Sequence, residues 1–172
     1  MLNPFATETV TFETPIAMLI ACHDRVRQYA ALTETLARHV QRNGADAAAV
    51  AGAQSILRYF DVAAPLHHQD EDEDLFPALI SQGSPELVRQ IETVMAEHDE
   101  LDALWQQVRV SLLHVVAGDG KALDLALAQD FALRYPAHAA QEETQIYPAA
   151  ALLDATLLAQ LGRNMALRRQ LN

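Results

Sequence analysis

The sequence predicts an all-α protein folded as an up-down-up-down four-helix bundle with a short C-terminal helix. Alanine and leucine abound, whereas β-branched and aromatic residues are scattered, so strand signals are almost absent. Apolar residues recur at intervals of three and four, which is the period of a helix rather than a strand. Four long helices joined by short loops must pack as antiparallel neighbours, and this arrangement is a bundle.

Start and stop signals divide the first half of the chain into two helices. Thr14-Pro15 reads as an N-cap followed by proline at the first helical position, and Asn43-Gly44 is a stop signal. A first helix of roughly 28 residues is therefore expected between them. The second helix is predicted from about Asp46 to Ser81, because Gly83 ends it.

The second half of the chain repeats these signals. Ser84-Pro85 starts a third helix, which extends to the break at 118–120. The fourth helix is predicted from about Lys121 to Tyr147. After Pro148 we expect a short amphipathic helix over 149–161, followed by an arginine-bearing tail that frays.

Length and composition predict a single domain. A chain of 172 residues with 51% apolar residues can bury one sizeable core. Within it, residues 1–13 are expected to be an N-terminal extension, 14–150 the bundle, and 151–172 the C-terminal helix and tail.

Charge and cysteine content exclude several classes of partner. The formal net charge of −11 would repel nucleic acid phosphates and anionic membrane surfaces. Cys22 is the only cysteine, which fits a reducing compartment, and its expected role is that of a small buried hydrophobic residue. No signal peptide or run of 18 apolar residues is found, so a cytoplasmic location is expected. The oligomeric state stays open, and a homodimer is compatible with the sequence.

Each predicted long helix interrupts its apolar stripe with one histidine. These residues are His23, His67, His98 and His138. A lone histidine on an apolar face is usually an ordinary core residue, but four of them need a joint explanation. We counted residues from each histidine to the turn that separates it from the next histidine along the chain. The two counts for each pair differ by only one or two residues. This mismatch equals about 1.5 to 3 Å of helix rise, so all four rings are expected in one layer.

An internal repeat identifies the acids that accompany these histidines. PLHHQDEDEDLFP (65–77) aligns without a gap on PAHAAQEETQIYP (136–148), which pairs His67 with His138 and Glu71 with Glu142. In a helix, positions i and i+4 project from the same face, so each histidine and its glutamate can both point at the bundle axis. The chain therefore resembles two helical hairpins related by a pseudo-twofold axis.

The first copy of the repeat allows a second register. His68 and Asp72 form a similar pair, rotated by about 100° around the helix, on a competing stripe with Leu57, Ala64 and Leu75. The second copy has Ala139 at the position of His68, which favours the His67 register. His68, Asp72 and Glu143 remain further candidate ligands, and the acidic residues outside the favoured register are expected mainly on a solvated face: Asp70, Asp72, Glu73 and Asp74.

Four histidines and two carboxylates in an apolar layer predict a metal centre. Unpaired buried carboxylates cost several kcal/mol each unless they take up protons. Six imidazole and carboxylate ligands are too many for one tetrahedral zinc, and calcium prefers oxygen alone. They suit two iron or manganese ions bridged by the carboxylates, with two histidines on each metal and positions left open for solvent, dioxygen or another small ligand. Two iron ions are expected, and manganese or zinc could substitute for them. Pro65 and Pro136, inside their helices, are expected to bend them and to widen the bundle for metal.

The motifs together resemble the hemerythrin-like, or HHE cation-binding, family. The resemblance covers residues 14 to about 150 and is carried by four segments in order: HDRVR from His23, HxxxEDEDLFP from His67, EHDEL around His98, and HxxxEETQIYP from His138. It implies a non-haem di-iron centre in a four-helix bundle. The four histidines would be terminal ligands, and Glu71 and Glu142 would be bridges.

One departure from the family pattern bears on function. Hemerythrins that carry dioxygen have an additional histidine on the third helix, one turn before the one matching His98, and here that position is Val94. The chain thus resembles the four-histidine di-iron branch, which includes bacterial proteins that repair iron centres and eukaryotic iron-sensing domains. The repair proteins carry an additional N-terminal domain with cysteines, whereas only about thirteen residues precede the first helix here.

Three functions follow from these features as alternatives. The first is sensing, storage or a stress response through iron and a small ligand, O2 or NO. The second is a di-iron oxidase or peroxidase-type enzyme, or an iron-donating repair protein. Tyr135 and Tyr147 could supply electrons or hydrogen bonds in such an enzyme, although core packing is their expected role. The third is a metal-free helical scaffold.

Overall fold

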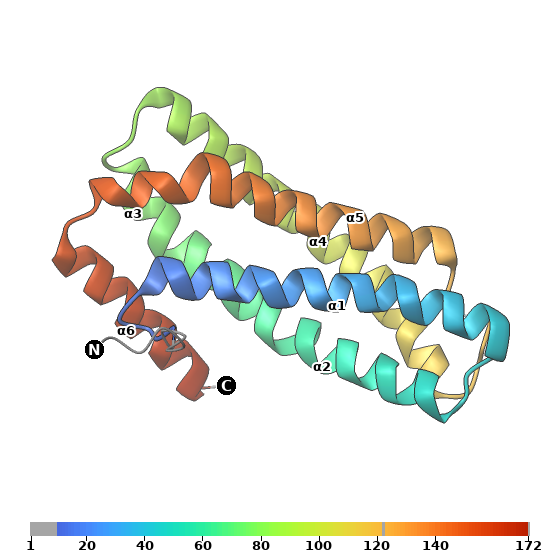
Figure 1. Cartoon of the computed structure of the whole chain (residues 1–172). Helices are drawn as coiled ribbons and strands as arrows, with labels where there is room; N and C mark the ends of the chain where they lie inside the picture. Colours follow the sequence, from blue (N-terminus) through green and yellow to red (C-terminus); the bar gives the residue numbers. More distant parts are fainter. Residues whose placement is uncertain (1–9, 122, 172) are drawn as a thin grey trace, which may run out of the picture.

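The computed structural model describes residues 10–121 and 123–171, and these residues form helices and connecting turns without a strand. Most of the predicted N-terminal extension, residues 1–13, lies outside the described residues. The all-helical fold is confirmed (Figure 1). Its long elements are α1 (Pro15–Asn43), α2 (Ala47–Asp70), α4 (Pro85–Val116) and α5 (Leu125–Gln141). Shorter ones are the π-helical turns η1 (Glu71–Leu75) and η2 (Glu142–Ile146), α3 (Phe76–Ile80), the 3₁₀ helix η3 (Tyr147–Leu152) and the C-terminal α6 (Ala155–Leu171).

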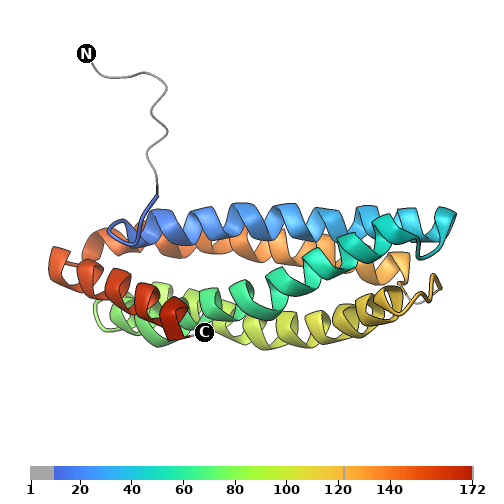
Figure 2. The ribbon, with the colours of Figure 1, turned by 90° about the horizontal axis from the view of Figure 1, so that it is seen from below.

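The four long helices pack in a ring of neighbours. Helix α1 contacts α2 and α5, and α4 contacts α2 and α5, so each long helix has two neighbours. Figure 2 shows the four long helices running along the long axis of the bundle, and in the view of Figure 1 α2 and α4 are inclined to α1 and α5. Helix α6 covers one end of this bundle, where it packs against α1, α2 and η1. No helix among the described residues is long and apolar enough to cross a bilayer.

Side-chain caps fix three of the helix starts. Asp46 accepts a hydrogen bond from the backbone N–H of Ala49 at 2.8 Å, and Ser84 caps α4 in the same way. Asp124 accepts from the backbone N–H of Leu127 at 2.9 Å. The fourth long helix therefore begins at Leu125 rather than at about Lys121, because the acidic cap sets its first turn.

Both copies of the internal repeat contain a π-helical turn. Each turn begins at the repeated glutamate, η1 at Glu71 and η2 at Glu142, six residues after Pro65 and Pro136 respectively. A π-helical turn closes hydrogen bonds from i to i+5 and so accommodates one more residue per turn than an α-helix. Such turns are rare and frequently lie at functional sites. The sequence analysis did not predict them.

The chain after the bundle is more ordered than the sequence predicted. Residues Tyr147–Leu152 form a 3₁₀ helix, and α6 then continues to Leu171. The expected helix over 149–161 with a frayed tail is therefore wrong in its bounds. Buried Leu161 and Met165 hold α6 against the bundle, and Arg168 binds acidic residues of α2 and η1.

The buried residues form two apolar clusters with a polar layer between them. One cluster contains Phe60, Trp105 and Phe131. The other contains Phe76, Ile91 and Val94. Val94 occupies the position of the additional histidine of dioxygen carriers, and it is fully buried. The buried polar residues that belong to neither cluster are His23, Thr33, His67, Asp70, Glu71, His98, His138 and Glu142. Thr33 donates a hydrogen bond within α1, to the Tyr29 carbonyl.

Candidate metal centre

The four predicted histidines come from four different helices and meet in the interior. His23 lies on α1, His67 on α2, His98 on α4 and His138 on α5. All four are at most 5% exposed. Glu71 and Glu142, the first residues of the two π-helical turns, are completely buried in the same layer.

The Nε2 atoms of the histidines face the two glutamates. Glu142 carboxylate oxygens lie 3.1 Å from His23 Nε2, 3.3 Å from His98 Nε2 and 3.1 Å from His138 Nε2. Glu71 Oε2 lies 3.5 Å from His67 Nε2 and 3.7 Å from His98 Nε2. Each glutamate thus reaches histidines of both hairpins, which is the position expected of a bridging carboxylate.

The potential ligand atoms separate into two groups. His23, His67, Glu71 and Glu142 form the first group, within which these atoms lie no more than 4.8 Å from one another. The second group is His68, His98 and His138, at the same spacing. We call these groups position 1 and position 2. The four histidines of the favoured register therefore divide two and two, and His68 joins the pair from the second hairpin.

His68 lies at the edge of the layer rather than on a separate face. Its ring stacks on that of His98, with centroids 4.0 Å apart and planes at 10°. Burial, followed by the nearby His98, lowers the pKa of His68 well below its ordinary value. The ring is then neutral at pH 7, which is the form that binds metal.

Three of the histidines bind a carboxylate through their outer ring nitrogen. Glu143 lies 2.9 Å from His23 Nδ1, and Asp72 lies 3.0 Å from His98 Nδ1. Glu97 lies 2.9 Å from His138 Nδ1. An ionised carboxylate only accepts hydrogen bonds, so Nδ1 carries a proton and Nε2 faces inward. At His98 burial opposes the charge, but the carboxylates of Asp72 and Glu142 outweigh it and raise the pKa to about 9, so a cation would displace the Nε2 proton of that ring. Histidines that bind metal in proteins are typically oriented by such partners.

Asp72 and Glu143 therefore lie on the far side of the rings from the inward-facing atoms. Of the two candidate roles, orientation of His98 and His23 fits this placement, and direct ligation does not. The expectation that Asp72 belongs to a solvated face is corrected, because its carboxylate contacts His98 and is about one-third exposed. Glu97 was missed, although the sequence signal was present in EHDEL directly before His98.

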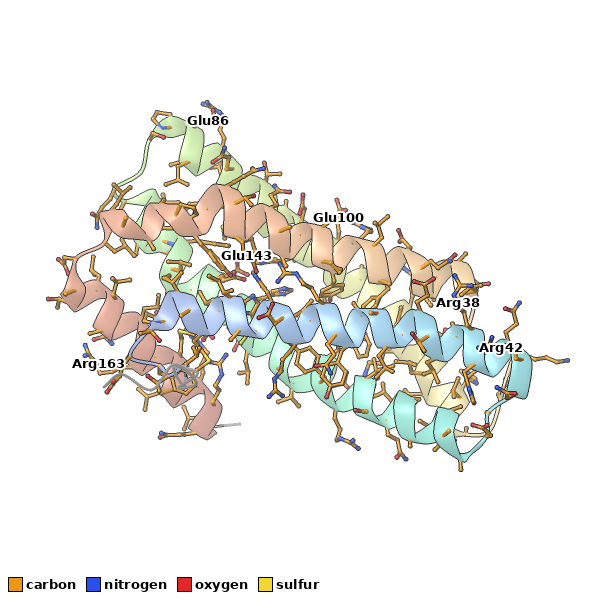
Figure 3. All side chains as sticks on the ribbon, in the orientation of Figure 1. Arg38, Arg42, Glu86, Glu100, Glu143 and Arg163 are labelled. Atoms are coloured by element: carbon orange, nitrogen blue, oxygen red, sulfur yellow. The ribbon has the colours of Figure 1, made fainter. Side chains whose placement is uncertain are left out.

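Arg27 supports the carboxylate that orients His23. The Glu143 side chain extends from η2 towards α1 (Figure 3) and accepts a hydrogen bond from Arg27 Nη2 at 2.8 Å. Burial opposes the ionisation of Glu143, but the hydrogen bonds from Arg27 and His23 outweigh it and lower its pKa. Glu143 is therefore an anion at neutral pH and holds the Nδ1 proton of His23.

Tyr147 reaches the inner side of position 1. Its hydroxyl donates a short hydrogen bond to Glu71 Oε1 and lies 3.3 Å from His23 Nε2. The Tyr147 and His23 rings are parallel, with centroids 5.5 Å apart. The expectation of a core aromatic holds for Tyr135, whose hydroxyl donates to the Leu101 carbonyl. For Tyr147 it is incomplete, because this side chain also contacts the polar layer.

Several inward-facing atoms lack a hydrogen bond among the described residues. These buried atoms are Glu71 Oε2, Glu142 Oε2 and His138 Nε2. They do lie within ion-pair distance of other members of the layer. Burial, together with the Glu142 carboxylate, raises the pKa of Glu71 well above its ordinary value. Burial likewise opposes the charge of Glu142, but the nearby imidazoles of His138, His23 and His98 outweigh it and lower its pKa. Metal ions accept lone pairs from all of these atoms at once, so the donor set fits cations held by nitrogen and oxygen.

Part of the acidic run beside the centre is buried in an ion-pair cluster. Asp70, expected on a solvated face, is completely buried, and Arg168 donates to its Oδ1 at 2.6 Å. Arg169 lies 2.8 Å from Asp70 Oδ2. Arg168 also contacts Asp74 and the largely exposed Glu73. The expectation of solvent exposure fails for Asp70 and Asp74 because α6 supplies arginines that the bundle alone does not offer.

Two cavities reach the layer from the surface, both beside position 2. One, of about 760 Å³, lies between α4 and α5 and is lined by Glu97 and His138 among others. The other, of about 410 Å³, lies between α2 and α4 and is lined by His68, Asp72 and His98. Small solutes can therefore approach the outer side of position 2 through either groove.

Comparisons with known proteins agree with this geometry. The family model described as the hemerythrin HHE cation binding domain matches residues 14–150. A protein of Haemophilus influenzae named only as an uncharacterized protein is 32% identical over 160 residues, which cover 93% of this chain and 92% of that protein. The matched residues include all four histidines and both bridging candidates, and the buried His/Glu layer indicates a metal-binding protein. The chain belongs to the hemerythrin HHE cation-binding family.

Proposed function

We propose that the chain holds two iron ions in the polar layer and binds a small ligand there. His23 and His67 would be terminal ligands of one ion, His98 and His138 of the other, and Glu71 and Glu142 would bridge them. The observation that supports this most is the convergence of four buried Nε2 atoms on two buried carboxylates. Without bound cations this layer would destabilise the fold, because burying polar groups without full compensation costs free energy.

The donor set favours iron or manganese over calcium and zinc, and we propose iron. Calcium requires oxygen ligands, and structural zinc is usually tetrahedral with four ligands. A mixture of imidazoles and carboxylates shared by two ions suits iron or manganese, as in di-metal sites of other helical bundles. Two ferrous ions with open positions would supply reversible binding of O2 or NO and one-electron chemistry.

The chain's own residues would control this chemistry. The outer carboxylates, Asp72, Glu97 and Glu143, would keep the imidazoles in the tautomer that offers Nε2. The apolar clusters on both sides of the layer would limit access of water. We infer a role in sensing, storage or a stress response, because an open position beside each ion would bind a small ligand.

An experiment with NO tests this function directly. Protein reconstituted with two ferrous ions is titrated with NO without oxygen, and its visible absorption spectrum is recorded. New absorption bands that saturate at a fixed ratio of NO to iron are expected. A spectrum that does not change while two irons remain bound would contradict binding of the small ligand.

A second candidate function is oxidation by the di-iron centre. It is favoured by Tyr147, whose hydroxyl contacts Glu71 and lies near His23, where it could deliver a proton or an electron. Repeated turnover of peroxide without loss of iron would favour an enzyme of this kind. A single stoichiometric oxidation would favour the sensing or storage role.

A further inference from the structure

The two positions are related by the internal repeat, and three pairs of equivalent residues break that symmetry. His68 in the first copy corresponds to Ala139 in the second, and Phe76 corresponds to Tyr147. Cys22, directly before His23, corresponds to Glu97, directly before His98. Each of these differences changes the surroundings of one position and not the other.

The first difference adds an imidazole to position 2. His68 follows His67 in α2, yet its ligand atom lies with those of His98 and His138 rather than with that of His67. The His68 ring stacks face to face on the His98 ring, which keeps the two imidazoles together. Ala139 is 1% exposed and offers position 1 no equivalent group.

The second difference concerns the orientation of the histidines. His138 in position 2 is held through Nδ1 by Glu97 at 2.9 Å. His67 is its counterpart in position 1, and its Nδ1 is buried without a hydrogen bond among the described residues. The residue that would correspond to Glu97 is Cys22, which cannot offer a carboxylate. His67 thus lacks the outer partner that strengthens a histidine as a ligand.

The third difference concerns the aromatic neighbour. Phe76 stacks near His98 with centroids 6.1 Å apart and gives position 2 an apolar neighbour. Tyr147 gives position 1 a hydroxyl, which hydrogen-bonds to Glu71. A cation in position 1 must therefore compete with Tyr147 for the Glu71 carboxylate.

We propose that His68 is a fifth imidazole ligand, an inference that rests on the proposed function. This ligand makes position 2 the tighter of the two cation sites. Position 2 then has three histidines, two of which are oriented by carboxylates. Position 1 has two histidines, of which one, His23, is oriented in this way. Its two carboxylates, Glu71 and Glu142, also face His98, so they are shared with position 2 and do not favour position 1. The two cavities described above are lined by histidines of position 2, so this position is accessible to an incoming cation.

The test is a titration of the metal-free full chain with Co²⁺ in the absence of oxygen. Calorimetry gives the two affinities, visible absorption follows the coordination, and X-ray absorption at the cobalt edge counts imidazoles. The unaltered chain should bind two ions, the first at least about tenfold more tightly than the second, with five imidazoles shared between them. Loss of an outer partner costs roughly 10- to 100-fold in metal affinity, so loss of His68 itself should cost at least that much.

Two variants separate the positions. His68→Ala should weaken the first binding step and remove one imidazole from the count. The repeat itself carries alanine at 139, so this substitution fits the helix, and His68→Gln provides a second variant of similar size. His67→Ala should instead weaken the second step and preserve the first. His39→Ala, outside the layer and bonded to Asp46, is the matched control and should change neither step.

The outcomes distinguish this inference from the proposed function. Two bound ions with unchanged affinities and imidazole count in His68→Ala would overturn the fifth ligand while leaving the two-cation centre intact. Two equal steps in the unaltered chain would overturn the ranking of the positions. Failure of the unaltered, folded chain to bind cobalt or iron at all would overturn the proposed function itself.

Discussion

The ion-pair cluster between α6 and the acidic run allows a quantitative prediction about stability. Asp70 is completely buried, and its two carboxylate oxygens face Arg168 at 2.6 Å and Arg169 at 2.8 Å. Replacing both arginines with methionine keeps long apolar stems on α6 but removes both cations. A buried carboxylate that loses its partners is destabilising by about 3–5 kcal/mol. We therefore expect the Arg168→Met/Arg169→Met variant to be less stable by this amount.

The size of the effect should depend on how many cations remain. Arg168→Met alone leaves Arg169 beside Asp70, so its cost should be that of hydrogen bonds to a charged group, about 1.5–3 kcal/mol. For a chain of this length, each kcal/mol corresponds to roughly 2–4 °C in the melting temperature. The double variant should thus melt roughly 6–20 °C lower than the unaltered protein, and the single variant noticeably less.

Urea unfolding followed by far-ultraviolet circular dichroism measures these differences. The protein is first treated with a chelator, because bound metal would add its own stabilisation. Arg163→Met is the matched control on the same helix. Arg163 is exposed and donates to Gln160, so its loss should cost within about 0.5 kcal/mol.

A third variant tests whether the uncompensated charge is the cause. Adding Asp70→Asn to the double arginine variant removes the buried charge and should recover part of the lost stability. A triple variant no more stable than the double variant would refute this reasoning. So would a double variant as stable as Arg163→Met.

Three further predictions concern the layer and its surroundings. Tyr147→Phe introduces the residue found at the equivalent position of the first repeat copy, Phe76. It should lower the free energy of unfolding of the metal-free protein in urea by about 1–3 kcal/mol, because Glu71 loses a buried hydrogen bond. Unchanged stability would contradict that contact. Glu97→Gln should weaken metal binding roughly 10- to 100-fold by calorimetry, because His138 loses its anionic partner, and equal affinity would count against the orienting role. Burial raises the pKa of the Cys22 thiol, so at pH 8 less of it is thiolate than in free cysteine and a maleimide reagent should label it more slowly; labelling as fast as free cysteine would show that the thiol is not shielded.

The fold and the convergence of the histidines follow from local patterns in the sequence. Apolar periodicity, the Thr14-Pro15 and Ser84-Pro85 starts and the glycine breaks define helices of nearly the observed lengths. Once these helices pack antiparallel, distance from a shared turn determines height along the bundle. The four histidines therefore meet in one layer, as the spacing predicted.

The features that the sequence did not predict depend on contacts between distant segments. Asp70 is buried because Arg168, almost one hundred residues later, returns to it on α6. The role of Glu97 depends on the packing of α5 against α4, which brings His138 within hydrogen-bond distance of its carboxylate. The π-helical turns depend on backbone hydrogen bonds that no spacing rule specifies. His68 reaches the edge of the layer because its ring stacks on that of His98, a residue of a distant helix. Periodicity alone could not decide between these neighbouring registers.

The metal content of the protein tests the central claim most directly. The full chain is produced with iron in the medium and purified without added metal. Iron is then counted per chain, beside a variant in which both Glu71 and Glu142 are replaced by glutamine. We predict two irons per folded chain and their loss in the variant. Folded protein without bound metal, even after anaerobic incubation with ferrous iron, would contradict a di-iron centre.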